Sequence, residues 1–345
     1  MNDNFDFPFN SPNEIKMTEG EKKSHKKIFS KICLALFVYL LVSQGLSIAL
    51  VYVLAYTAPK LLYSQDFLML LSSVVQYAVA FPIFYKAIKS VPKQEPAATR
   101  ISIKSLLKYL TVCMLFVYIG NYISNFLLTR IGSLMGRMPE NQLDSMLDAT
   151  SIYVSLLVVG LVGPIFEELI FRKLFIDRLT PYGDAVCVFF PALIFGLFHG
   201  NLYQFFYAFL IGAMLSYVYT KTGKIVYSIV IHMFINLFCG ILPTLVYSLV
   251  DYDQLIEMVS AGTLTDEYVM ANAGPLSLFL FYTYGFLAMV VIGFVVFWRN
   301  YRKIHLNKGE IRWPKGSGGD IMFFNAGAIT LIMSCILLIA YNTFG

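Results

Sequence analysis

Residues 151–176 read SIYVSLLVVGLVGPIFEELIFRKLFI. No residue of this run before Glu167 is charged, and the run is long enough to cross the hydrocarbon core of a bilayer, which takes about 20 helical residues. The adjacent acids Glu167 and Glu168 then stand well inside it. We therefore expect a transmembrane helix that carries two carboxylates at membrane depth.

The rest of the chain has the same apolar character. Of its 345 residues, 58% are hydrophobic and 14% are charged, whereas a soluble domain carries about 25% charged residues. Apolar runs predict nine membrane spans, at residues 32–57, 67–88, 106–128, 151–176, 185–203, 204–220, 225–248, 276–298 and 321–344. The short runs at 185–203 and 204–220 are closely joined, so eight spans are the alternative. The predicted fold class is all-α, a polytopic transmembrane helical bundle.

Basic residues give an independent test of this topology. With the amino terminus inside, the inner segments hold 23 of the 26 Lys and Arg residues; these segments are 1–31, 86–108, 172–184, 221–224 and 298–320. Because Lys and Arg concentrate in cytoplasmic loops, we expect a cytoplasmic amino terminus in a bacterial-type plasma membrane. The net charge of +5 is then a sign of topology, and no nucleic-acid partner is expected.

Composition divides the chain into five predicted parts. These are a cytoplasmic polar tail (1–30), N-terminal transmembrane helices (31–150), a core that carries the polar residues (151–248), an outer acidic loop (249–275) and C-terminal transmembrane helices (276–345). The five cysteines all fall inside apolar runs and form no C-x-x-C pair. They are predicted to be packing residues.

Very few ionisable residues lie deep within the predicted spans. They are Glu167, Glu168, His199 and His232, and each such residue costs about 2.5–3.5 kcal/mol to insert on translocon scales. Structural roles are the alternative: a Glu–Arg pair can clamp helices, and an amide can join them with about 1 kcal/mol. The concentration of these groups within residues 167–236 favours a functional site.

Spacing along the helices adds detail. Glu168 and Arg172 are four residues apart and share a helix face. Glu167 points about 100° away from Glu168 and is available for other work. His232 and Asn236 are also four apart, so imidazole and amide project together.

These groups suffice for hydrolysis of an amide by activated water. A buried carboxylate beside an imidazole can deprotonate water, and imidazole and amide donors can stabilise the developing oxyanion. The alternative is a zinc site, in which Glu167, His199 and His232 hold Zn²⁺ with water as a further ligand.

Three short motifs in order resemble the CPBP family, which comprises type II CAAX prenyl proteases and bacteriocin-processing or immunity proteins and is also called the ABI family. The motifs are E-E-x-x-x-R (Glu167, Glu168, Arg172), F-x-x-x-H (Phe195, His199) and H-x-x-x-N (His232, Asn236). The resemblance covers about residues 155–245. It implies an intramembrane endopeptidase whose site opens toward the cytoplasm.

The resemblance also implies a role for each motif residue. Glu167 would be the general base that activates water, assisted by His199. Glu168 and Arg172 would orient and stabilise the site, and His232 with Asn236 would form the oxyanion hole. A glutamate-type protease without a cofactor is favoured over the zinc form, because an acid beside a structural acid–arginine pair is better suited to act as a base.

The expected partners are the lipid bilayer and a membrane-anchored peptide or protein, of either the CAAX type or the bacteriocin-leader type. Two other functions stay open at this point. A non-catalytic immunity or scaffold protein would use the polar cluster to bind a partner helix. A transporter is disfavoured, because carriers often show paired repeats and here the polar residues form one block. The sequence makes no prediction of oligomeric state.

Overall fold

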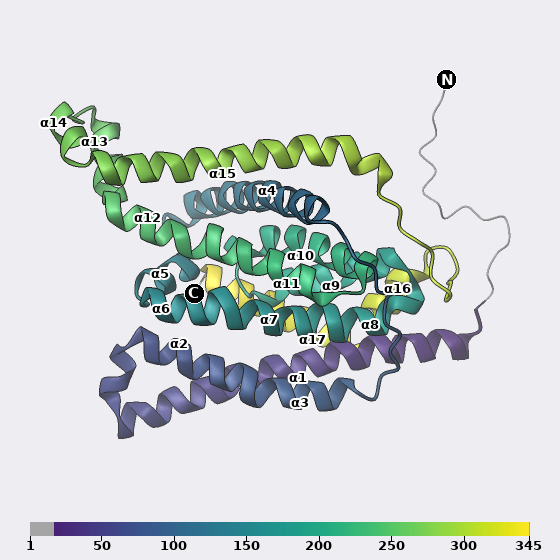
Figure 1. Cartoon of the computed structure of the whole chain (residues 1–345). Coiled ribbons are helices and arrows are strands. Elements are labelled where there is room, and N and C mark those ends of the chain that lie inside the picture. Colours follow the sequence, from purple (N-terminus) through teal and green to yellow (C-terminus); the bar gives the residue numbers. More distant parts are fainter. Residues whose placement is uncertain (1–16, 345) are drawn as a thin grey trace.

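The structure, a computed structural model, describes residues 17–344. This part of the chain contains no β-strand, only an isolated bridge between Gly183 and Lys308. Most of the long helices lie side by side in an elongated bundle (Figure 1). The predicted all-α class is confirmed.

Eight segments within residues 17–344 are long and apolar enough to cross a membrane. Four are single helices: α1 (Glu19–Thr57), α4 (Ile103–Met135), α10 (Leu202–Thr222) and α17 (Ala326–Phe344). Four are composite: α2 (Gln65–Val74), η2 (Val75–Ala80) and α3 (Phe81–Ile88); α6 (Ile152–Ser155), η3 (Leu156–Val162), α7 (Gly163–Glu168), η4 (Leu169–Leu174), α8 (Phe175–Leu179) and η5 (Thr180–Tyr182); α11 (Ile225–Ile235), η6 (Asn236–Ile241) and α12 (Leu242–Val250); α15 (Ala273–Asn300) and η7 (Tyr301–Lys303).

The ninth expected span, at 185–203, is a shorter helix. This helix, α9, covers Asp184–Phe198, and its 15 residues rise by about 22 Å, less than the hydrocarbon thickness of about 30 Å. It pairs with α10 as an antiparallel hairpin, in which Asp184 at its start forms a salt bridge with Lys221 near the end of α10. Pro191 lies inside α9 without breaking it.

The first span begins earlier than the sequence predicts. Residues 19–30, expected to belong to an irregular polar tail, are the first turns of α1. Thr18 and Glu21 form a capping box: the Thr18 hydroxyl accepts from the Glu21 amide at 3.2 Å, and the Glu21 carboxylate accepts from the Thr18 amide at 2.8 Å. The first 16 residues of that predicted tail lie outside the described residues.

Short elements join the long helices. They are η1 (Pro59–Tyr63), α5 (Gln142–Asp148), α13 (Tyr252–Ala261), α14 (Asp266–Ala271) and α16 (Ser317–Phe323). The acidic α13 and α14 lie at the opposite end of α15 from α16 (Figure 1).

The basic segments gather at one end of the bundle, at the right of Figure 1. Lys22 and Lys26 of α1 pair with Asp320 of α16 at 2.8 and 2.7 Å. In the same region, the Thr99 amide donates to the Thr222 carbonyl at 2.7 Å. The predicted inner segments therefore share one end, as the charge pattern requires, while the side of the membrane they face stays a prediction.

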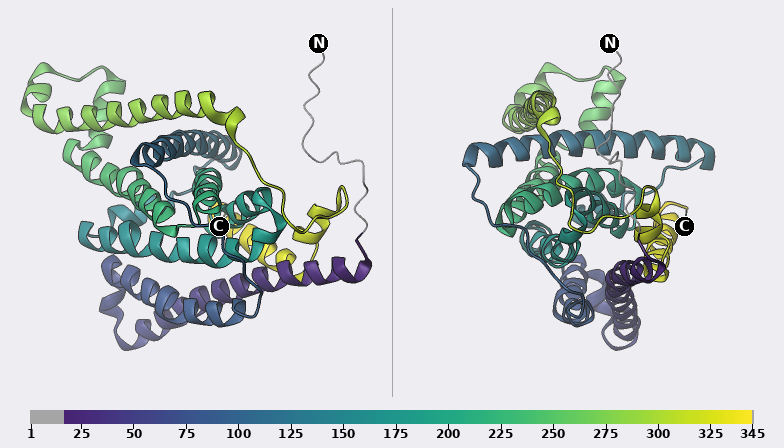
Figure 2. Two further views of the ribbon diagram at one scale, coloured as in Figure 1. Left: turned by 45° about the vertical axis from the view of Figure 1, so that its right-hand side comes forward. Right: turned by 90° about the vertical axis from the view of Figure 1, so that its right-hand side faces the viewer.

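Helix α4 crosses the bundle at a steep angle. In the right-hand view of Figure 2, α4 lies across the picture while α1 and α15 are seen nearly end-on. It runs antiparallel to α10, since the Ser124 hydroxyl donates to the Leu202 carbonyl at 3.0 Å and the rings of Tyr109 and Tyr217 lie 6.2 Å apart.

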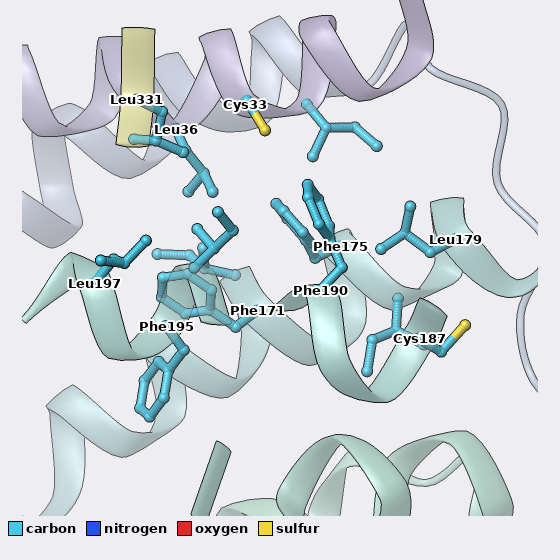
Figure 3. Close-up of a cluster of buried hydrophobic side chains, with 14 of the residues drawn as sticks. Cys33, Leu36, Phe171, Phe175, Leu179, Cys187, Phe190, Phe195, Leu197 and Leu331 are labelled. Atoms are coloured by element: carbon cyan, nitrogen blue, oxygen red, sulfur yellow. The ribbon is translucent and has the colours of Figure 1, made fainter. Parts of the chain in front are cut away.

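Aromatic side chains fill the core beside the polar motifs. Figure 3 shows Phe171, Phe175, Phe190 and Phe195 packed between the helices, with Leu36 of α1 facing them. The rings of Phe171 and Phe195 are 5.1 Å apart, and those of Phe175 and Phe190 stack at 5.7 Å. Because lipid tails are as apolar as these side chains, dense packing rather than escape from water holds the helices together.

Three spans widen into a π-helical turn directly before a proline. A proline has no amide donor and its ring clashes with the carbonyl four residues back, and a wider turn relieves this clash. In each case the residue before the proline donates to the fifth carbonyl back, namely Phe81 to Gln76, Gly163 to Val158 and Leu242 to Leu237, with Pro82, Pro164 and Pro243 following. These turns adjoin the candidate site.

Candidate active site

The three predicted motifs converge on one region of the bundle. Glu167 and Glu168 end α7, and Arg172 lies one turn later in η4. His199 follows the last residue of α9, and His232 lies near the end of α11. The wide turns η3 and η4 flank α7, so the backbone around the two acids departs from regular α-helix on both sides. Such π turns occur frequently at functional sites.

Glu168, Arg172 and His232 form a buried ionic cluster. Glu168 Oε1 lies 3.2 Å from Arg172 Nη1 and 2.9 Å from His232 Nδ1, and the side chains of Glu168 and Arg172 are fully buried. Glu168 therefore fixes one nitrogen of the imidazole and leaves Nε2 to face elsewhere. A charged group buried this deeply persists only when it is paired.

Glu167 occupies a different environment from its neighbour. Its side chain is 31% exposed, and its Oε2 lies 3.6 Å from His232 Nε2. This distance exceeds that of a direct N–H···O hydrogen bond, about 2.7–3.2 Å, and matches a contact that a water can bridge. The imidazole of His232 thus connects a buried carboxylate on one side to an accessible carboxylate on the other.

The accessible carboxylate lines a cavity of about 200 Å³. The cavity wall includes His199 from the end of α9, whose Nδ1 hydrogen-bonds to the Phe195 carbonyl at 2.8 Å. That bond fixes the orientation of the ring and leaves Nε2 of His199 unused. One cavity therefore brings together the base and the histidine that the motifs predict for it.

The ring of Phe195 lies at the centre of this arrangement. The Arg172 guanidinium sits over it at 4.4 Å from the ring centroid, a cation–π contact. The imidazoles of His199 and His232 meet it edge-on at centroid distances of 4.7 and 5.8 Å. Phe195 therefore contacts Arg172 and both histidines of the motifs.

The side chain of Asn236 forms a hydrogen bond to a neighbouring helix. Its amide nitrogen donates to the carbonyl of Val159 in η3 at 2.9 Å. This bond ties η6 to η3, the two wide turns that face each other. In this structure the amide joins helices, while its assignment to an oxyanion hole stays a prediction.

Sequence reasoning missed a second set of cavity residues. Tyr39 and Gln44 of α1, and Gln76 and Tyr77 of η2, line the cavity together with Glu167. The sequence did not predict them, because none of these four side chains is charged at neutral pH. The signal available was an amide within each of two long apolar runs.

A zinc site would have to use Glu167, His199 and His232. Among residues 17–344, no group of three or more His, Cys, Asp and Glu side chains lies close enough together to hold a metal ion. Both histidines pack edge-on against the ring of Phe195. The choice between the metal-free form and the zinc form stays a prediction.

A second cluster lies on the basic side of the site. Lys173, next to Arg172, pairs with Asp177 at 3.1 Å and with Glu95 of the loop before α4 at 2.8 Å. Hydrogen bonds from Lys173 and Lys93 lower the pKa of Glu95 to about 2. This cluster fastens the loop to the helix that carries the two acids.

The fold and the site define an integral membrane protein with a paired acid–imidazole centre inside its bundle. Residues 149–238 match the family model for the Rce1-like type II CAAX prenyl endopeptidases. The chain is also 26% identical, over 197 residues, to "Putative membrane peptidase YdiL" of Bacillus subtilis (strain 168); the match covers 54% of this chain and 75% of that protein. No solved structure gives a significant match. Both comparisons support the predicted resemblance to the CPBP family, and they support a membrane protease.

Proposed function

We propose that this protein is an intramembrane endopeptidase in which Glu167 activates water for attack on a peptide bond of a membrane-anchored substrate. The proposal rests on the different surroundings of the two adjacent acids. Glu168 is fully buried and paired with Arg172, whereas Glu167 is 31% exposed on the cavity wall. Only an accessible carboxylate can exchange protons with a water in the cavity.

The chemistry follows from the contacts of the two acids. The Glu167 carboxylate removes a proton from water as the water oxygen attacks the substrate carbonyl. As the imidazolium, His232 is held at Nδ1 by Glu168 and donates from Nε2 to the oxyanion that forms. Collapse of the tetrahedral intermediate breaks the C–N bond, and Glu167 returns its proton to the leaving amine. His199, on the same wall, assists Glu167 in holding the water.

Two substrate classes suit such a site. They are a CAAX-type prenylated peptide and a bacteriocin leader peptide, both delivered by the membrane itself. We further propose that the basic end of the bundle faces the cytoplasm of a bacterial-type plasma membrane, because 23 of the 26 basic residues belong to segments predicted to lie at that end.

The test is cleavage by purified protein in liposomes that contain either a farnesylated CAAX-type peptide or a single-span leader peptide. Wild type is expected to cleave one of them, and Glu167→Gln to be slower by about 10²–10⁴-fold, the usual contribution of a general base. A chelator is expected to leave the rate unchanged. Loss of activity on chelation would instead favour the zinc form, and failure of wild type on both peptides would favour the immunity or scaffold function.

A further inference from the structure

One wall of the cavity comes from outside the segment that matches the family. Residues 149–238 supply Glu167 and His199. The opposite wall comes from the N-terminal spans, where Gln44 of α1 and Gln76 of η2 contribute carboxamides. No motif of the sequence includes these two residues.

Both amides lie near the middle of a spanning helix. Gln44 is 13 residues from Lys31, the last basic residue before the apolar run, and 13 from Thr57, where α1 ends. Gln76 is 11 residues from Gln65 and 12 from Ile88, the ends of its span. At membrane mid-depth a polar group without a hydrogen-bond partner is costly. The two amides must therefore have a function that offsets this cost.

Neither amide holds helices together. Within residues 17–344 the side chains of Gln44 and Gln76 make no hydrogen bond to the protein. By contrast, Asn236 donates to a carbonyl of a neighbouring span. Interhelical bonding, the usual structural role of membrane amides, therefore does not account for Gln44 and Gln76.

The reaction itself limits the form in which a substrate can be cleaved. In a helix, each backbone carbonyl already accepts a hydrogen bond from the amide four residues further on. The segment at Glu167 must therefore be unwound before water can attack its carbonyl, and the freed backbone groups need partners at membrane depth.

We propose that Gln44 and Gln76 bind the peptide backbone of an extended substrate segment and present it to Glu167. This inference rests on the proposed function. A carboxamide carries one acceptor oxygen and a donor NH₂, the same pair that a peptide group offers, so each glutamine can replace a neighbouring strand in pairing with the chain. Because backbone is bound, recognition at this position is independent of the substrate side chain.

The first experiment measures cleavage of the two liposome peptides by Gln44→Leu and Gln76→Leu. Leucine keeps much of the bulk and removes both hydrogen-bonding groups. Loss of one such bond is expected to lower kcat/KM about tenfold, mainly through KM. The control is Asn125→Leu on α4, which removes an exposed amide that lies outside the cavity. The melting temperature of every variant is measured as the check on folding.

The second experiment separates backbone from side-chain recognition. Peptides are N-methylated one position at a time around the cleaved bond, which removes a single backbone donor. At one position, methylation is expected to slow wild type about tenfold and to have little further effect on Gln76→Leu or Gln44→Leu, because the bond is already lost. Asn125→Leu should respond to methylation as wild type does.

The outcomes distinguish the two proposals. If wild type cleaves neither peptide, the proposed function fails for these substrates, and the backbone proposal falls with it. If wild type cleaves and both glutamine variants match Asn125→Leu, the backbone proposal alone is overturned. Additive effects of methylation and substitution at every position would likewise overturn it.

Discussion

Glu167 and Glu168 are covalent neighbours with opposite surroundings. The side chain of Glu168 is fully buried between Arg172 and His232, while that of Glu167 is 31% exposed on the cavity wall. On a helix, adjacent residues point about 100° apart, which is enough to put one carboxylate in the packed core and the other in the cavity. The sequence E-E-x-x-x-R therefore encodes a structural acid and an accessible acid in two consecutive positions.

Replacing Glu168 by Gln is expected to destabilise the fold far more than the same change at Glu167. The change leaves the buried Arg172 cation without its partner, and breaking a buried pair in this way costs about 3–5 kcal/mol. Unfolding in detergent measures the effect, with Glu167→Gln as the matched control. Equal stability of the two variants would show that the Glu168–Arg172 pair does not hold the site.

Much of the residue-level site was predictable from the sequence. The i to i+4 spacing gave the Glu168–Arg172 pair, which the structure contains at 3.2 Å. The partner of Asn236 was not predictable, because its bond to Val159 depends on how two wide turns face each other. Gln44 and Gln76 were missed since an uncharged amide in an apolar run gives a weaker signal than a buried charge.

At the scale of elements, the π turns position the site. The η3 turn ends at Val162, directly before α7. The amide of Gly163, the first residue of α7, donates to the carbonyl of Val158, and Pro164 follows. A wide turn shifts the angular position of every later residue on the helix. The direction of Glu167, three residues after Pro164, therefore depends on this proline.

Pro164→Ala is expected to let the helix close to regular α geometry and rotate Glu167 away from His232. Alanine restores the amide donor and removes the ring clash, so the melting temperature should stay the same or rise. The cleavage rate should fall by about 10²-fold, the loss that a misplacement of about 1 Å can cause. An unchanged rate in a variant with normal stability would show that the π turn does not set the position of Glu167.

The helix count also belongs to this scale. Hydropathy located the spans, and the expected ninth is α9, which at 15 residues is too short to cross alone. Its end was hard to predict because apolar residues continue past His199 into α10. Gly200, with φ of 67°, makes the turn there, and the structure uses it to bring His199 to the cavity.

At the scale of the whole molecule, one end of the bundle is basic and cross-linked by ion pairs. Asp320 joins α16 to Lys22 and Lys26 of α1, and Trp313 stacks on Tyr182 nearby. This end is also where the sequence predicted the cytoplasmic segments. The charge pattern alone predicted that the basic segments share one end. The contacts between these segments could be seen only in the folded chain.

Low pH is expected to weaken the ion pairs that join α16 to α1. Hydrogen bonds from Lys22 and Lys26 lower the pKa of Asp320 below its usual 3.8, so its stabilising effect is complete above about pH 4 and is lost as the pH falls through the lowered value. The fluorescence of Trp313 should shift in that window. Asp320→Asn should show the shifted signal already at pH 7, and a signal in the variant identical to wild type would contradict the coupling.

The orientation is tested by labelling single cysteines in intact cells. A cysteine at Lys308 should react with a membrane-impermeant maleimide only after the cells are opened, and a cysteine at Ser260 should react at once. The native thiols give little background because four of the five are buried. The reverse pattern would place the basic end outside.

The central claim is that the Glu167 carboxylate activates the attacking water. Its most direct test is the single-turnover rate of peptide cleavage in liposomes by Glu167→Gln, at enzyme concentrations that bind all of the peptide. We predict normal peptide binding, a normal melting temperature and a rate about 10²–10⁴-fold below wild type. A rate within about twofold of wild type in a fully folded variant would contradict the claim.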